Sequence, residues 1–288
     1  MALIQPARAA EPTPVAAPGA KLVEVAKEYE FTEGPAVDAE GNVYFTDQPN
    51  DRILKWSTDG KLTTFLQPCG RSNGLYFDQD GTLLACADEK NELWRIKPDG
   101  SHEVLIADFE GQRLNGPNDL WVRPDRGIYF TDPYYQRPYW KHKQPELKVQ
   151  GVYFFDPATK QLKRVADNLE QPNGIIGTPD GKTLYVADIR AGKTYAFDIQ
   201  PDGSLQNQRL FCELGSDGMT IDRSGNVYLT GDGVTVFNPQ GEKIDHIQVP
   251  ARWTANVCFG GSDHQTLFIT ASQAVYTLQT TQHQATPR

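Results

Sequence analysis

One pattern occurs six times along the 288-residue chain. Each copy has a polar or acidic residue, usually followed by Gly or Asp, then an apolar stretch, a D-x-x-G-type turn and a strand-like run that often ends in Asp. The first copy begins at Glu33 and runs through Asp38 and Gly41 to Asp47. We call the first residue of each copy its leading residue. The six leading residues are Glu33, Asn73, Asn118, Asn173, Asp217 and Asn256, at spacings of 40, 45, 55, 44 and 39 residues.

A repeat of about 45 residues built from short strands is typical of a β-propeller blade. The run after each turn, such as residues 82–87 or 127–131, is continuously apolar, as expected for a strand buried between neighbouring blades. The sequence therefore predicts an all-β fold, a six-bladed β-propeller, as a single domain over residues 21–288. A strand near residues 22–25 is expected to close the ring by joining residues 275–278 of the last blade.

Residues 1–20 are rich in Ala and Pro and predict a flexible N-terminal lead-in. The Ala-Arg-Ala triplet at 7–9 resembles the end of a secretory signal, although the apolar core of such a signal is missing. A remnant of an export signal, which favours a periplasmic or secreted location over a cytoplasmic one, and a tail of no consequence are both open. The cysteines form no C-x-x-C pair and are expected to be buried thiols, with disulfides as the alternative for an exported protein. They are Cys69, Cys86, Cys212 and Cys258.

The formal net charge of −9 argues against a nucleic-acid or anionic-membrane partner, because such partners select a basic stripe. No stretch of the sequence approaches the roughly 20 apolar residues of a transmembrane helix. A closed ring of blades is complete in itself, and we expect a monomer or a weak homo-oligomer.

Propeller symmetry should gather the six leading residues around one end of a central channel. Carboxylate and amide oxygens in this number suit a hard divalent cation such as Ca²⁺ or Mg²⁺, so the pattern predicts a central metal site. The absence of Cys and His from the set disfavours a structural zinc site. Each leading residue alone is also an ordinary turn residue. The departure from a uniform repeat, with Glu33 in one blade and Asp217 four blades later, favours a functional role.

Four tripeptides at leading positions resemble the signature of the gluconolactonase, senescence-marker-protein and luciferin-regenerating-enzyme-like family. They are Glu33-Gly34-Pro35, Pro117-Asn118-Asp119, Pro172-Asn173-Gly174 and Ser216-Asp217-Gly218. The resemblance extends over about residues 25–280 and implies a six-bladed propeller with a divalent metal in the central tunnel.

The resemblance also implies site residues. Glu33, Asn173 and Asp217 look like metal ligands, and Asn118 looks like a fourth ligand or a substrate contact. Asp217 also looks like the catalytic acid or base. Ca²⁺ is the expected cofactor, although Mg²⁺, Mn²⁺ or Zn²⁺ can occupy an oxygen-rich site. The diisopropyl-fluorophosphatase branch resembles the same pattern, with all four residues around calcium.

Substrate contacts are harder to transfer from the family. Its animal members carry an Arg two positions before the Asn of the third repeat, where this chain has Gly116, so the nearest candidate is Arg113. Arg71 and Asn73 are further expected contacts, together with Asn118.

The long third spacing holds a segment dense in aromatic and cationic residues that starts at Asp132. Asp132, Tyr134 and Arg137 are expected substrate contacts if this segment forms a lid or a binding wall. The alternative is a surface hairpin packed on its own aromatic rings.

The chain has no G-x-S-x-G nucleophile elbow, and its five histidines lie outside the leading positions. By elimination, these observations favour metal-assisted hydrolysis. The resemblance implies a metal-dependent hydrolase that opens a small-molecule lactone such as gluconolactone, with Asp217 as general base. Two alternatives are a phosphotriesterase or fluorophosphatase, and a non-catalytic binding propeller in which the metal only stabilises the channel.

Overall fold

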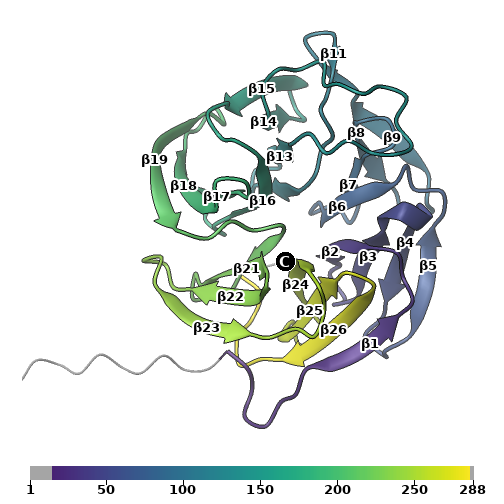
Figure 1. Ribbon diagram of the computed structural model, residues 1–288, viewed down its shortest axis with the longest axis vertical. Helices are drawn as coiled ribbons and strands as arrows, with labels where there is room; N and C mark the ends of the chain where they lie inside the picture. The colour runs from purple at the N-terminus through teal and green to yellow at the C-terminus, as the bar shows by residue number, and fades with distance from the viewer. Residues whose placement is uncertain (1–14, 286–288) are drawn as a thin grey trace, which may run out of the picture.

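The computed structural model describes residues 15–285. Six four-stranded antiparallel sheets surround one axis, which confirms the six-bladed propeller (Figure 1). From the axis outward, blades 1 to 3 are β2 (Thr32–Val37), β3 (Val43–Asp47), β4 (Arg52–Trp56), β5 (Leu62–Leu66); β6 (Ser72–Phe77), β7 (Leu83–Ala87), β8 (Glu92–Ile96), β9 (His102–Ile106); and β12 (Leu120–Val122), β13 (Ile128–Asp132), β14 (Gly151–Asp156), β15 (Gln161–Ala166).

The second half of the ring repeats this order. Blades 4 to 6 are β16 (Pro172–Gly177), β17 (Thr183–Asp188), β18 (Lys193–Ile199), β19 (Leu205–Cys212); β20 (Met219–Ile221), β21 (Val227–Gly231), β22 (Gly233–Phe237), β23 (Lys243–Ile247); and β24 (Thr254–Gly260), β25 (Thr266–Ala271), β26 (Ala274–Gln279), β1 (Val23–Lys27). Outside the blades lie a 3₁₀ turn, η1 (Gln48–Asn50), and a ribbon of β10 (Asp108–Phe109) and β11 (Gln112–Arg113). Within residues 15–285, no helix has the length and apolar character needed to cross a membrane.

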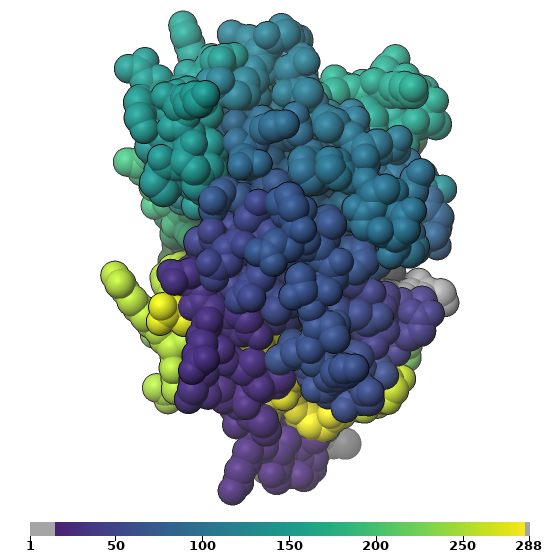
Figure 2. All heavy atoms as spheres, turned by 90° about the vertical axis from the view of Figure 1, so that its right-hand side faces the viewer, coloured from purple at the N-terminus to yellow at the C-terminus, as the bar shows by residue number. Residues whose placement is uncertain are grey.

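The ring closes where the two ends of the chain meet in blade 6. β1 pairs antiparallel with β26, with Val23 opposite Thr277, as the sequence predicts. In Figure 2 the purple residues of the first strands lie against the yellow residues of the last ones. Residues 1–14 of the expected lead-in lie outside the described residues. Val15, the first described residue, is buried, and its N–H donates to Asp245 Oδ2 at 2.9 Å.

The core lies between neighbouring blades. The second strands β3, β7 and β13 are buried at every position, which confirms the interpretation of the continuous apolar runs. Leu84 and Cys86 of β7, for example, pack with Leu120 and Phe130 of blade 3. All four cysteines are buried and free, as expected. The D-x-x-G segments form the turns from first to second strands, with the Gly41 N–H donating to the Asp38 carbonyl.

Three of the four aspartates that end second strands bind backbone. Asp47 accepts the N–H groups of Glu30 and Phe31, and Asp188 accepts those of Glu170 and Gln171. Each aspartate therefore fixes the segment that leads into its own blade's first strand. Asp132 does the same in blade 3, whereas Asp88 of blade 2 does not.

Candidate functional site at the channel mouth

The leading residues lie at the start of the innermost strands, as predicted, and they interrupt the regular ladder there. In blades 1, 2, 4 and 6 the register shifts at the leading residue, for example between Glu33 and Ala36 and between Pro172 and Ile175. In blades 3 and 5 the ladder begins after Asn118 and Asp217. Such bulges leave an extra residue unpaired and re-aim its side chain. The six positions can therefore face the axis instead of alternating across a sheet.

The glycine that follows several leading residues has a packing reason. A Cβ at Gly74 would lie 2.5 Å from the Asn118 carbonyl oxygen of the next blade. Gly34 meets the Asn73 carbonyl still more closely. The inner strands of successive blades touch at these points, and the Gly74 N–H donates to the Asn118 carbonyl at 2.8 Å. Only a residue without a side chain allows this approach.

The third copy departs from this pattern, because Asp119 stands where four other copies carry glycine and the sixth carries Val257. The Asp119 carboxylate is 6% exposed and lines the channel interior. We did not expect Asp119 to be a site residue. The replacement of Gly by Asp directly after Asn118 was the sequence signal that could have identified it.

Asn173 and Asp217 form the centre of the site. The Asn173 Nδ2 donates to Asp217 Oδ1 and to the Tyr135 hydroxyl, both at 2.9 Å. With both amide protons engaged, Asn173 Oδ1 is buried without a hydrogen-bond partner among the described residues. The Trp253 indole N–H donates to the second Asp217 oxygen at 2.6 Å. Tyr135 and Trp253 were not predicted, because each comes from a connecting segment with no repeat to mark it.

Glu33 and Asp119 share one donor. The Asn256 Nδ2 lies 3.2 Å from Glu33 Oε2 and 3.5 Å from Asp119 Oδ2, and the Gly34 N–H donates to the same Glu33 oxygen at 2.6 Å. Asn256 therefore lines the site through its side chain. Asn73 lies on the same ring with a buried Oδ1 that has no partner among residues 15–285.

The site concentrates negative charge away from water. Burial, followed by the charges of Asp217 and Asp119, raises the pKa of Glu33 well above its usual range. Burial raises the pKa of Asp119 to about 7 and that of Asp217 to about 6. For Asp217, the bonds from Trp253 and Asn173 and the charge of Arg137 oppose the effect of burial. The charge of Asp217 thus adds to the effect of burial on both Glu33 and Asp119.

Residues 133–150 connect β13 to β14, and we call them the insert. Tyr135 of the insert faces the site through its bond to Asn173, whereas the Tyr134 hydroxyl donates to Gln136 within the insert. The Arg137 guanidinium lies 5.6 Å from the centre of the Tyr135 ring. Trp140 is buried and packs with Tyr134 and Tyr139, so the insert has its own aromatic core as well as a contact with the site.

The other expected substrate contacts are held elsewhere. Arg71 donates to the Pro49 carbonyl and lies 4.5 Å from the centre of the Tyr139 ring. Arg113 pairs with Glu146 at 3.0 Å, in the ribbon outside the blades. Asp132 accepts the N–H groups of Asn115 and Gly116, at 2.9 and 2.8 Å, and is fully buried.

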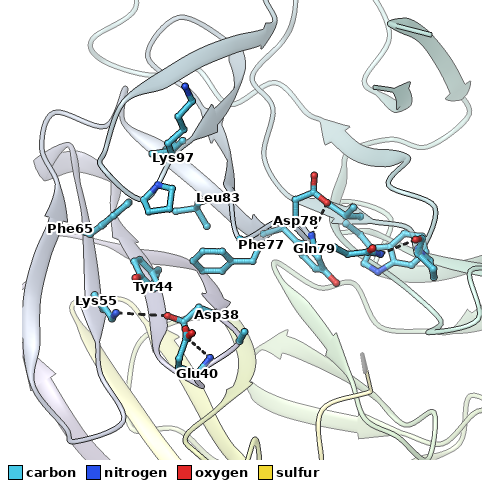
Figure 3. Close-up of a pocket in the computed structure, with 18 of the residues that line it drawn as sticks. Asp38, Glu40, Tyr44, Lys55, Phe65, Phe77, Asp78, Gln79, Leu83 and Lys97 are labelled. Carbon is cyan, nitrogen blue, oxygen red and sulfur yellow. Dashed lines mark hydrogen bonds and ion pairs between the residues drawn. The ribbon is translucent and has the colours of Figure 1, made fainter. Parts of the chain in front are cut away.

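A cavity of about 800 Å³ lies at the opposite ends of the inner strands, among the D-x-x-G turns. Figure 3 shows Tyr44, Phe65 and Phe77 on its wall, with Lys55 directed toward Asp38. Two of the acids here are already paired, since Lys55 lies 3.8 Å from Asp38 and Arg126 lies 2.6 Å from Asp78. None of the leading residues lines this cavity. Despite its size, it lacks the converging, unpaired polar groups found at the channel mouth.

Known proteins resemble this chain over most of its length. The family description "SMP-30/Gluconolactonase/LRE-like region" matches residues 31–273. A gluconolactonase of Zymomonas mobilis is 28% identical over 89% of this chain and 80% of its own length. A solved gluconolactonase structure from Xanthomonas campestris is 31% identical, covers 96% of this chain and 99% of its own, and superposes with a TM-score of 0.85. A calcium-binding regucalcin from Agrobacterium tumefaciens, 19% identical over 97% of this chain and all of its own, shares the fold with a TM-score of 0.75.

Proposed function

Because this chain belongs to the SMP-30/gluconolactonase/LRE-like family, we propose that it is a metal-dependent hydrolase that opens a sugar lactone. The observation that carries the proposal is the Asn173–Asp217 pair, where a half-buried carboxylate is oriented by two donors beside an unpartnered amide oxygen. The relatives named gluconolactonase support the choice of a lactone over other substrates.

The residues at the channel mouth fit a divalent cation. Glu33, Asn173 and Asp217 would hold it, with Asn118 as a fourth ligand. The unpartnered Asn173 oxygen and the mutual repulsion of the buried carboxylates both favour a bound positive charge. Among residues 15–285, no three His, Cys, Asp or Glu side chains are grouped as metal ligands, so the amides are needed to complete the set. Ca²⁺ is the preferred ion, by analogy with the calcium-binding regucalcin.

A bound cation of this kind polarises a carbonyl oxygen and lowers the pKa of nearby water. Asp217 acts as the base because the hydrogen bonds from Trp253 and Asn173 orient its carboxylate and favour the ionised form. It accepts a proton from the attacking water, whose oxygen bonds to the lactone carbonyl carbon. The bond from that carbon to the ring oxygen breaks, and the proton passes to the ring oxygen. The product is the open hydroxy acid.

Around the reacting atoms, the donors of the chain orient the substrate. Arg137 is close enough to Asp217 for its charge to lower the pKa of that carboxyl group. Its guanidinium would bind the lactone oxygens and the product carboxylate. Tyr135 holds the Asn173 amide through one hydrogen bond, and Trp253 holds the Asp217 carboxylate through another. Asn73 offers a further amide at the same ring of positions.

The test is hydrolysis of gluconolactone, other lactones and a phosphotriester, with and without chelator, by the wild type and Asp217→Asn. We expect chelator-sensitive lactonase activity and a loss of at least about 100-fold in kcat for Asp217→Asn, as is usual when a general base is removed. Full activity in that variant, or activity that survives chelation, would contradict the proposal. Hydrolysis of the phosphotriester alone would favour the fluorophosphatase alternative, and metal binding without turnover would favour a binding propeller.

A further inference from the structure

Asp88 ends the second strand of blade 2, but it does not bind backbone N–H groups as its counterparts in blades 1, 3 and 4 do. Its side chain is only 2% exposed, and three side-chain donors converge on its Oδ2. These are Arg137 Nε at 2.7 Å, the Tyr139 hydroxyl at 2.6 Å and Gln48 Nε2 at 2.9 Å. Two of the three donors come from the insert of blade 3, so Asp88 bridges two blades.

The backbone of Asp88 binds the insert as well. Its carbonyl accepts the Trp140 indole N–H at 2.8 Å. A Cβ added to Gly116 would lie 2.9 Å from Asp88 Oδ1 and 3.0 Å from the Trp140 ring, which shows how closely the insert, Asp88 and Gly116 are packed. The insert is thus fastened to blade 2 by Arg137, Tyr139 and Trp140.

The insert is fastened to blade 4 on its other side. The Tyr135 hydroxyl accepts from Asn173, and the Gln171 side chain donates to the Tyr134 carbonyl at 3.4 Å. Residues 133–150 therefore span from blade 2 to blade 4 across the mouth of blade 3. Arg137 lies between the two attachments, bonded to Asp88 and lying over the Tyr135 ring.

Asp88 uses only the Nε–H of Arg137. The two terminal amino groups form no hydrogen bond with residues 15–285, although the Arg137 side chain is just 22% exposed. A guanidinium held through Nε presents its remaining donors as a fork that suits a carboxylate or a pair of oxygens. Asp88 of blade 2 thus orients Arg137, which lies near the Asn173–Asp217 pair of blades 4 and 5.

We propose that Asp88 is a positioning residue that fixes Arg137 and the insert as a rigid substrate-binding wall at the channel mouth. The role of Arg137 toward a lactone rests on the proposed function, whereas the fastening of the insert by Asp88 does not. The wall limits which lactones reach Asp217, and Arg137 binds an oxygen of the substrate or the carboxylate of the product. A surface hairpin packed only on its own aromatic rings would not need a buried acid from a neighbouring blade.

Asp47 provides the matched control. It occupies the same place in blade 1, is fully buried, and pairs with Arg52 at 2.7 Å, but its partners all belong to blade 1 or the segment leading into it. Asp47→Asn removes the same charge and a similar ion pair without touching the insert.

The first experiment is limited proteolysis with trypsin, which needs no activity. Lys141, Lys143 and Lys148 are exposed cleavage points inside the insert. We expect Asp88→Asn to speed cleavage after these lysines about tenfold, because loss of a charge-assisted bond favours local opening. Tyr139→Phe, a milder change on the other side of the same contact, should speed it by a smaller factor. Asp47→Asn should leave these three bonds as protected as in the wild type.

The second experiment is a double-mutant cycle with Arg137→Ala on gluconolactone. We expect Asp88→Asn to raise KM about tenfold with kcat within about threefold, and the double variant to be no worse than Arg137→Ala. Additive losses would show that Asp88 does not act through Arg137 and would overturn the proposal. Unchanged proteolysis in both Asp88→Asn and Tyr139→Phe would do the same. If no lactone is hydrolysed, the proteolysis arm still decides whether Asp88 fastens the insert, and only the proposed function fails.

Discussion

Single side-chain contacts determine how Asn173 presents its amide. The Asn173 amide donates one N–H to Asp217 and the other to Tyr135, so its Oδ1 faces away from both acceptors. Removing either acceptor leaves the amide free to turn over and present its NH₂ group instead. The hydroxyl of Tyr135 should therefore influence metal binding without being a ligand.

Tyr135→Phe tests this role. We expect the affinity for Ca²⁺, measured by titration calorimetry on chelator-treated protein, to fall about tenfold, as is usual when a group that orients a ligand is lost. Tyr134→Phe is the control, because that neighbouring hydroxyl bonds only to Gln136 within the insert. Equal losses in the two variants, or no loss in Tyr135→Phe, would contradict the assigned orientation of Asn173.

Asp132 makes stability depend on pH. Burial raises its pKa to about 7, even though the Asn115 and Gly116 N–H groups oppose the shift. The unfolded value is about 3.9, so between roughly pH 4 and 7 the folded state keeps a proton that the unfolded state has released. The free energy of unfolding therefore falls as pH rises through this window.

Asp132→Asn should flatten that dependence. In urea unfolding of metal-free protein, we expect the loss of stability between pH 5 and 7.5 to be smaller than in the wild type by about 2 kcal/mol. Asn keeps an acceptor for one of the two N–H groups and cannot titrate. An unchanged pH slope would mean that Asp132 is ionised throughout this range in the folded protein.

At the scale of the strands, blade architecture was predictable because it follows from a local pattern. Buried second strands and D-x-x-G turns are encoded within one repeat of the sequence, and the closing strand β1 follows from the offset between the first repeat and the start of the described chain. The ring of leading residues followed from the same periodicity. The glycine after a leading residue was visible too, although its reason, contact with the next blade's carbonyl, required the structure.

The contacts made by connecting segments could not be predicted in the same way. The insert was visible as a long spacing, but no local pattern says that it crosses to Asp88 in one direction and Asn173 in the other. Trp253 likewise reaches Asp217 from a segment between β23 and β24. Such contacts depend on the three-dimensional order of the blades, which residue spacing alone does not describe.

Gly74 offers a test of the contact between inner strands. Its backbone φ lies outside the range that favours glycine, so Gly74→Ala costs stability only through collision with Asn118 and Asp119 of the next blade. We expect a cost of about 3 kcal/mol, seen as a fall in Tm of roughly 10 °C.

The control for this experiment is Gly81→Ala. Gly81 has a φ of +80° with open space around an added Cβ, so the variant should lose only about 1 kcal/mol through backbone strain. Similar losses in the two variants would mean that blades 2 and 3 can separate slightly without cost, and that the glycine pattern reflects turn geometry alone.

For the molecule as a whole, the proposed metal site joins blades that are far apart in sequence. Glu33 belongs to blade 1, Asn118 to blade 3, Asn173 to blade 4 and Asp217 to blade 5. Without a cation, the carboxylates of Glu33 and Asp217 repel each other, as the raised pKa of Glu33 indicates. The site therefore opposes closure of the ring when empty and favours closure when a cation is bound.

Charge repulsion in the metal-free site predicts how both added Ca²⁺ and the Asp217→Asn substitution change Tm. Saturating Ca²⁺ at 100 times its Kd should stabilise the wild type by about 2.7 kcal/mol and raise Tm by roughly 5–10 °C. Asp217→Asn should abolish that rise, yet its metal-free Tm should equal or exceed that of the wild type, because a carboxylate that repels Glu33 has been removed. Asp232→Asn, the same change at an exposed acid in blade 5, should keep the full Ca²⁺ response. A metal-free Asp217→Asn protein that melts well below the wild type would instead make Asp217 a structural residue, and the argument from charge repulsion would fail.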